Sequence, residues 1–92
     1  MRMSQTKTEV EVATIQELVS ESNIVLYNDD VNTFDHVINC LVRICDHEPL
    51  QAEQCAWIVH LNGRCAVKTG VYDELEQMCH QLLDNGLSVQ LE

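Results

Sequence analysis

Three stretches of the chain repeat apolar residues at helical spacing. The first follows the steps i, i+3, i+4, i+7, i+8 and i+11 and comprises Phe34, Val37, Ile38, Leu41, Val42 and Cys45. The second lies between Pro49 and Gly63 and comprises Ala52, Cys55, Ala56 and Val59. The third lies over residues 73–84 and comprises Leu75, Met78, Cys79, Leu82 and Leu83. Such spacing gathers apolar side chains on one helical face, so we predict three helices packed on a common core.

Polar residues at the ends of these stripes fit helix boundaries. Asn32 is suited to cap the first helix, with Thr33 in its first turn. Asp73 and Glu76 have the spacing of a capping box at the start of the third helix. Asn-Gly pairs follow the second and third helices and are typical helix stops.

Shorter apolar runs predict three strands. Ile24–Tyr27 has strand composition, Arg64–Lys68 alternates polar with small apolar residues, and Leu87–Leu91 alternates apolar with polar residues. The element order is therefore β-α-α-β-α-β. We predict an α+β fold of two layers, in which a small antiparallel sheet carries three helices on one face.

The chain divides into a polar N-terminal segment and one folded domain. Residues 1–22 contain no glycine or proline and show only a sparse apolar pattern. This composition is typical of a mobile extension with a helix-prone end. We therefore assign residues 1–22 to a mobile N-terminal extension and residues 23–92 to the core domain, since 92 residues suffice for one core.

Charge narrows the range of partners. Lys and Arg total 5 against 15 Asp and Glu, which gives a formal net charge of −10. Nucleic acids and anionic membrane surfaces both require a basic face, which this composition does not supply. No stretch approaches the roughly 20 apolar residues of a spanning helix, and no apolar signal core is visible. We expect a soluble cytoplasmic protein that binds neither nucleic acid nor membrane.

The cysteines favour core packing over metal binding. Five of them, an odd number without a CxxC pair, lie within apolar runs, as reduced core cysteines do. The alternative is a metal site that uses His36 and Cys40, four residues apart, with His80 or Cys79. No second ligand pair at zinc spacing accompanies them, so we predict neither a metal nor a cofactor.

A polar corner between the first strand and the first helix is the candidate site. Asn28 and Asp29 leave the strand where Phe34 and Val37 open the helix. A carboxylate and a carboxamide can hold an ammonium group beside an apolar cavity. His60 is placed to join them, although by itself it also fits a helix C-terminus. No phosphate loop, GxSxG or HExxH motif occurs, so we predict a binding protein rather than an enzyme.

Three motifs line up along the folded part of the chain. V-L-Y-N-D-D-V-N-T-F-D-H-V-I-N-x-L occupies residues 25–41, A-W-I-V-H-L-N-G residues 56–63 and T-G-V-Y residues 69–72. Together they resemble the adaptor family of the ATP-dependent Clp protease, ClpS. The N-D-D corner and the V-H-x-x-G helix end are jointly specific at this separation, and the resemblance covers about residues 23–92.

This resemblance implies an adaptor for N-degrons, which are substrates with a large hydrophobic first residue. Such an adaptor delivers its substrates to the N-terminal domain of a Clp-type AAA+ unfoldase, which its extension is thought to engage. The matching positions imply that Asn28, Asp29 and His60 anchor the substrate α-amino group and that Asn32 lies near the second substrate residue. The implied side-chain pocket comprises Phe34, Val37, Ala56, Val59 and Leu87. We expect a monomer.

The chain departs from the family pattern at several positions. Phe34 and Ala56 stand where methionine is common, Thr33 replaces proline, and Asn32 replaces threonine. After Tyr72 the chain is about seven residues shorter, or two helical turns, and lacks the usual E-x-A-E-x-K run that helps to face the unfoldase. The alternative is a protein-interaction module of the same fold, which also resembles the C-terminal domain of the ribosomal stalk protein. Such a module docks on an AAA+ or ribosomal partner without recognising N-degrons.

Overall fold

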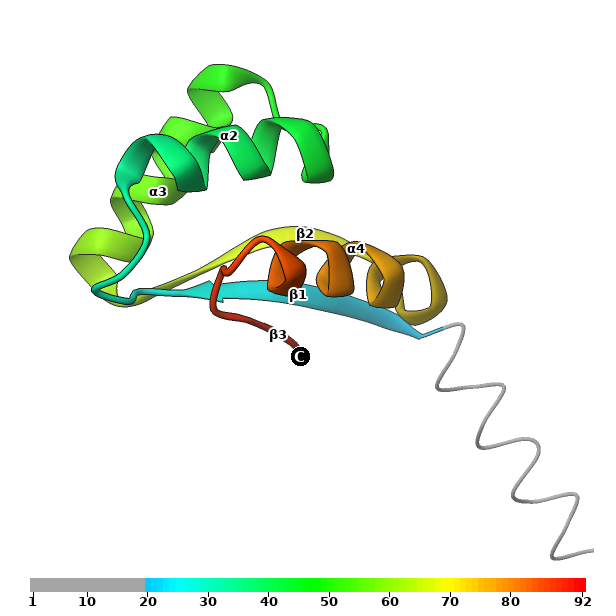
Figure 1. Cartoon of the computed structure of the whole chain (residues 1–92). Helices are drawn as coiled ribbons and strands as arrows, with labels where there is room; N and C mark the ends of the chain where they lie inside the picture. Colours follow the sequence, from blue (N-terminus) through cyan, green and yellow to red (C-terminus); the bar gives the residue numbers. More distant parts are fainter. Residues whose placement is uncertain (1–19) are drawn as a thin grey trace, which may run out of the picture.

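The elements of the computed structural model, which describes residues 20–92, follow the predicted order (Figure 1). Their bounds are β1 (Glu21–Tyr27), α2 (Phe34–Cys45), α3 (Pro49–Asn62), β2 (Arg64–Val71), α4 (Tyr72–Asp84) and β3 (Val89–Leu91). Most of the predicted extension, residues 1–19, lies outside the described residues. Within residues 20–92, no helix combines the length and apolar character needed to cross a membrane.

The sheet is antiparallel, with β1 in its centre and the order β2-β1-β3. Figure 1 shows α2, α3 and α4 on the same side of this sheet. The register of β1 with β2 shifts between Ile24 and Val25, so Val67 on β2 has no partner across the ladder. This irregularity is a β-bulge, which bends the strand. The predicted α+β fold, with helices on one face of a small antiparallel sheet, is confirmed.

The core lies between the sheet and the three helices. Its buried residues come from every element and are Ile24, Leu26, Cys40, Leu41, Cys45, Ala52, Val59, Val67, Leu75, Cys79, Leu82, Leu87 and Val89. All five cysteines are free. Three of them are buried in this core, and Cys55 and Cys65 are half-buried, as the apolar runs around them predicted.

Two predicted helix caps are wrong. Thr33 rather than Asn32 caps α2, because Thr33 Oγ1 accepts the backbone N–H of His36 at 3.1 Å. The capping box of Asp73 with Glu76 does not form, since α4 begins at Tyr72 without a side-chain cap. The reason is that β2 runs directly into α4, which leaves no turn where a polar residue can cap the helix.

Both long strands extend beyond their predicted bounds. β1 begins three residues before the predicted Ile24 and thus includes the last two residues assigned to the extension. β2 continues three residues past the predicted Lys68. The added residues pair with one another, as Glu21 with Val71, Ser22 with Gly70 and Asn23 with Thr69. Backbone pairing lengthens these strands where the side chains carry no apolar pattern. The last strand is shorter than predicted, because Leu87 remains in the turn that ends α4.

Candidate functional site

A pocket of about 310 Å³ opens where β1 leads into α2 and where α3 ends. Its volume lies in the range of small-ligand sites, roughly 300–1,000 Å³. Its lining includes all nine residues predicted for the site, namely Asn28, Asp29, Asn32, Phe34, Val37, Ala56, Val59, His60 and Leu87. The fold thus brings together residues from three separate parts of the sequence.

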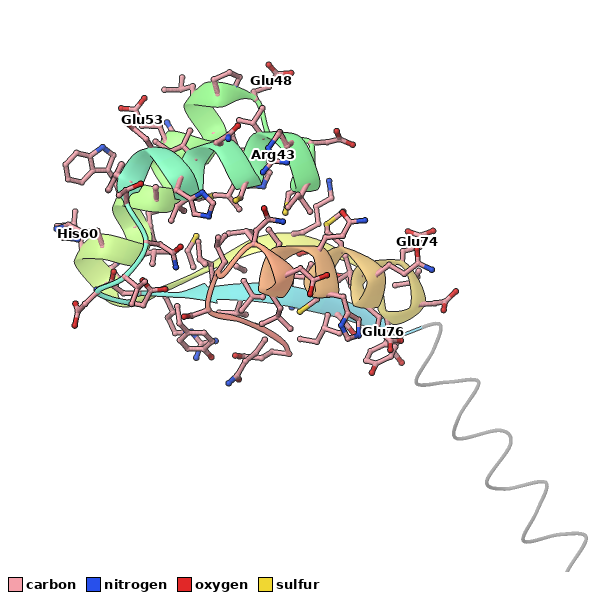
Figure 2. All side chains as sticks on the ribbon, in the orientation of Figure 1. Arg43, Glu48, Glu53, His60, Glu74 and Glu76 are labelled. Carbon is pink, nitrogen blue, oxygen red and sulfur yellow. The ribbon has the colours of Figure 1, made fainter. Side chains whose placement is uncertain are left out.

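The backbone joins the polar corner to the end of α3. The N–H of Asn28 donates to the carbonyl oxygen of Gly63 at 2.9 Å. Gly63 ends α3 with φ +91°, a left-handed conformation that favours glycine, and its N–H donates to Val59. Because the chain reverses there, His60 in the last turn of α3 lies beside the corner. Figure 2 shows the His60 side chain projecting at this end of the molecule.

The Asp29 carboxylate organises the corner. Oδ1 accepts the backbone N–H groups of Val31 at 3.0 Å and Asn32 at 2.8 Å. Oδ2 accepts Asn32 Nδ2 at 2.8 Å and Ser88 Oγ at 2.9 Å. These bonds, the one from the Asn32 backbone above all, lower the pKa of Asp29 to about 2 against the opposing effect of burial. Because a carboxylate offers about four acceptor positions, those of Asp29 are filled by the protein.

Asn32 connects the corner to the segment after α4. Its Nδ2 donates to Asp29 Oδ2 and also to the carbonyl oxygen of Gly86 at 2.8 Å. With the bond from Ser88 to Asp29, this holds both neighbours of Leu87 against the corner. Leu87, which is only 3% exposed, therefore forms part of the pocket wall although it precedes β3.

Three polar side chains at the pocket keep hydrogen-bonding atoms that the described residues do not use. The side chains of Asn28, Asp30 and His60 are exposed, and none of them forms a hydrogen bond or ion pair with another residue of the described chain. An amide oxygen, a carboxylate and a neutral imidazole nitrogen can each accept a hydrogen bond from an ammonium group. The pocket therefore combines unused acceptors with an apolar interior.

The apolar walls come from the two facing helices and the sheet. Phe34 and Val37 lie on α2 and are half-buried, whereas Ala56 and Val59 lie on α3 and are buried. Ala56 contributes only a methyl group, which leaves space beside the large Phe34 ring. A pocket of this kind accepts an apolar side chain by removing it from water.

Sequence reasoning missed three lining residues: Leu26, Tyr27 and Asp30. Asp30 is the second acid of the N-D-D corner, and the sequence pattern assigned it no role in the site. Since both acids of the pair fit a turn equally well, only the structure shows which one keeps free oxygens. Leu26 and Tyr27 end β1, and the strand alternation alone does not reveal that they also reach the pocket.

His36, one of the alternative metal ligands, forms a hydrogen bond within the protein. His36 Nε2 lies 2.8 Å from the carbonyl oxygen of Asn85 and therefore donates to it, while Cys40 Sγ lies 3.6 Å from the same nitrogen. Among residues 20–92 no group of three or more His, Cys, Asp or Glu side chains is arranged to hold a metal ion. His36 instead connects α2 to the end of α4.

Comparisons with known proteins agree on one family. Residues 17–90 match the family model described as ATP-dependent Clp protease adaptor protein ClpS. The ATP-dependent Clp protease adapter protein ClpS of Thermosynechococcus vestitus is 34% identical over 70 residues, which cover 72% of this chain and 71% of that protein. The solved structure of Agrobacterium tumefaciens ClpS2 bound to L-phenylalaninamide superposes with a TM-score of 0.77 at 19% identity, covering 80% of this chain and 96% of that one.

A eukaryotic protein also matches part of the chain. The E3 ubiquitin-protein ligase UBR1 of Mus musculus is 44% identical over 48 residues. The match covers 52% of this chain but 3% of the ligase, so it concerns one small segment of a much larger protein.

Proposed function

Because the chain belongs to the family of ATP-dependent Clp protease adaptor proteins, ClpS, we propose that its pocket binds the first residue of N-degron substrates. The free α-amino group is held at the polar corner, and a large hydrophobic first side chain fills the apolar interior. The observation that carries this proposal is the position of three unused acceptors at the mouth of one apolar pocket. The relative bound to L-phenylalaninamide, a free amine with an aromatic side chain, supports the same chemistry.

The ammonium group donates its hydrogen bonds to the side chains that form none with other residues of the described chain. Asn28 Oδ1, the Asp30 carboxylate and a ring nitrogen of His60 supply three acceptors for its three protons. Asp29, which we first assigned to direct contact, has its acceptor positions occupied and acts through its charge and its hold on the corner. An internal peptide segment lacks this charge and leaves the acceptors unpaired, which disfavours its binding.

A panel of peptides tests the pocket directly. In the first series the peptides differ only in the first residue. In the second series, each leucine-first or phenylalanine-first peptide of the first series carries one extra glycine before that residue, and its affinity is compared with that of the parent peptide. The added glycine keeps a free amine but moves the large side chain to the second position. We expect fluorescence anisotropy to show an affinity loss of at least tenfold, since about 100 Å² of lost apolar burial is worth over 2 kcal/mol. Equal affinity for both series would contradict the proposal.

We further propose that the chain works as a cytoplasmic monomer and delivers these substrates to the N-terminal domain of a Clp-type AAA+ unfoldase. In this division of work the chain recognises the substrate, and the partner unfolds and degrades it. The N-terminal extension then engages the unfoldase. Full-length protein is expected to accelerate degradation of a phenylalanine-first substrate by the Clp protease. A chain lacking residues 1–19 should keep its peptide affinity without this acceleration, and acceleration at the full rate would contradict the role of the extension.

A further inference from the structure

Trp57 packs on the pocket from outside. It is 49% exposed and does not belong to the lining, although its neighbour Ala56 does. The centroid of its ring lies 4.8 Å from that of Phe34, with the planes inclined by 59°. His60 completes the group, with ring centroids 6.1 Å from Trp57 and 6.3 Å from Phe34 in edge-on arrangements. Three aromatic rings thus meet at the pocket rim.

Phe34 is the wall residue that needs this support. The lining residues Leu26, Ala56, Val59 and Leu87 are at most 5% exposed, so the core fixes them. Val37 is half-buried, but it packs against the same core. Phe34 is half-buried, and its ring would have more than one staggered position available without a neighbour. Ala56 is too short to restrain it. Trp57 on the next helix supplies the surface against which the ring rests.

A fixed ring in the wall changes what the pocket prefers. Aromatic side chains favour tilted or edge-to-face contacts, and such a pair contributes beyond its buried area. That contribution corresponds to about a 2- to 12-fold gain in affinity for an aromatic ligand over an aliphatic one of similar size. A ring free to move would give less of this gain, because binding would have to order it.

We propose that Trp57 is a positioning residue that holds the Phe34 ring in the pocket wall, and that this ring pair makes the pocket select an aromatic first residue over leucine. The inference rests on the proposed function and names the substrate class of that same pocket. Trp57 acts through Phe34, since Trp57 itself does not line the pocket.

Three peptides that differ only in the first residue test the inference by fluorescence anisotropy. They begin with phenylalanine, leucine or cyclohexylalanine, the last being a saturated ring with the same number of carbon atoms. Wild-type protein should bind the phenylalanine peptide about 2- to 12-fold more tightly than the other two. Trp57→Ala should bring this ratio close to one, and Trp57→Phe, which keeps a ring, should restore much of it. Leu61→Ala is the matched control, because Leu61 lies one turn further along α3, is 72% exposed, and should not affect the ratio.

A double-mutant cycle tests whether Trp57 works through Phe34. Phe34→Leu removes the ring from the wall and should abolish the preference. Adding Trp57→Ala to Phe34→Leu should then change the ratio no further. The inference is overturned if Trp57→Ala lowers the affinity for all three peptides equally, or if it still shifts the ratio without Phe34.

The same titrations distinguish failure of the proposed N-degron binding from failure of the proposed aromatic selection. If no peptide with a free amine binds the wild-type chain, the proposed function itself is wrong. If phenylalanine and leucine peptides bind equally well, the pocket remains an N-degron site and only the aromatic selection is wrong.

Discussion

At the scale of single residues, the two neighbouring acids of the corner have different roles. The two oxygens of Asp29 accept four hydrogen bonds that shape the turn. The carboxylate of Asp30 lines the same pocket and has no hydrogen-bond partner among the described residues. Nothing in the sequence distinguishes them, since both are short acids in a turn. The difference arises from the backbone, which aims the Asp29 side chain at the N–H groups of Val31 and Asn32.

Asp30→Asn tests which acid faces the ligand. Because it keeps the shape of the side chain but removes its charge, we expect about a tenfold loss of affinity for a phenylalanine-first peptide. The melting temperature should stay unchanged, since the Asp30 side chain has no partner among the described residues. If anisotropy titrations show an unaltered affinity, Asp30 does not bind the ammonium group of the peptide.

The low pKa of Asp29 gives folding stability a defined pH dependence. Folding lowers this pKa from 3.8 to about 2, so the stabilisation is complete above about pH 4 and is lost as the pH falls towards 2. For this part-exposed group we expect about 1 kcal/mol after allowing for solvent screening.

Urea unfolding of the wild type and of Asp29→Asn between pH 6 and pH 2 measures this contribution. The difference in unfolding free energy between the two proteins should be largest at pH 6 and should shrink towards pH 2. A difference that stays constant across this range would show that the charged carboxylate adds nothing.

At the scale of elements, apolar spacing predicted the three helices well, and their ends poorly. The stripes of α2, α3 and α4 follow from side chains that face one core, which a periodic pattern records directly. Helix starts and strand ends depend on backbone pairing instead. Tyr72 begins α4 because β2 leads straight into it, and Glu21 joins β1 because Val71 is its partner. Neither the direct connection from β2 to α4 nor the pairing of Glu21 with Val71 can be recognised from the local composition.

The residues of the site likewise divide into those that the sequence pattern predicted and those that it did not. Eight of the nine predicted lining residues lie in two motifs, residues 25–41 and 56–63, which fall on opposite walls of one pocket. The ninth, Leu87, was implied by the family resemblance alone. That Asp30 lines the pocket and that Trp57 contacts Phe34 became evident only from the structure, because each depends on the direction a side chain takes. Hydrogen-bond directions and ring contacts are not encoded by spacing.

The turn between α2 and α3 provides a test at this scale. His47 is 5% exposed, and its Nε2 donates to the carbonyl oxygen of Val67 at 2.6 Å. Val67 is the residue that the β-bulge leaves unpaired, so His47 connects the helical hairpin to the irregular part of β2. Because a carbonyl oxygen only accepts hydrogen bonds, this contact places a proton on Nε2, while Nδ1 is buried without a partner among residues 20–92.

His47→Leu should lower the free energy of unfolding by about 1–2 kcal/mol, because the buried carbonyl of Val67 loses its donor. His80→Leu makes the same change at an exposed position of α4 and should stay within about 0.5 kcal/mol of the wild type. Chemical denaturation measures both. Equal effects of the two substitutions would mean that the bond to Val67 does not stabilise the fold.

At the scale of the whole molecule, the pocket and the start of α4 lie at opposite ends. Figure 2 shows His60 at one end and Glu74 with Glu76 towards the other, while Glu53 lies on α3 and Glu48 immediately precedes it. The chain carries a net charge of −10, so a peptide entering the pocket meets a negative field beyond the local anchors. In the proposed function, recognition of the first residue is local, whereas this field would act on the residues that follow it.

Peptide charge after the first residues should therefore affect affinity in a salt-dependent way. A phenylalanine-first peptide with lysines at positions four to six should bind roughly threefold or more tightly than one with glutamates at low salt. The difference should nearly vanish at about 0.5 M salt, where charges are screened within a few ångströms. A charge preference that does not change with salt would point to a specific contact instead.

The central claim is that a free α-amino group is recognised together with an apolar first side chain. One phenylalanine-first peptide, titrated with its amine free and with its amine acetylated, tests this most directly. Acetylation keeps the side chain and removes the positive charge and two of the three donors. We predict that affinity falls at least a hundredfold, because the proposed acceptors Asn28, Asp30 and His60, which line the pocket, would lose the cation they bind. Equal affinity for the two peptides would contradict the account.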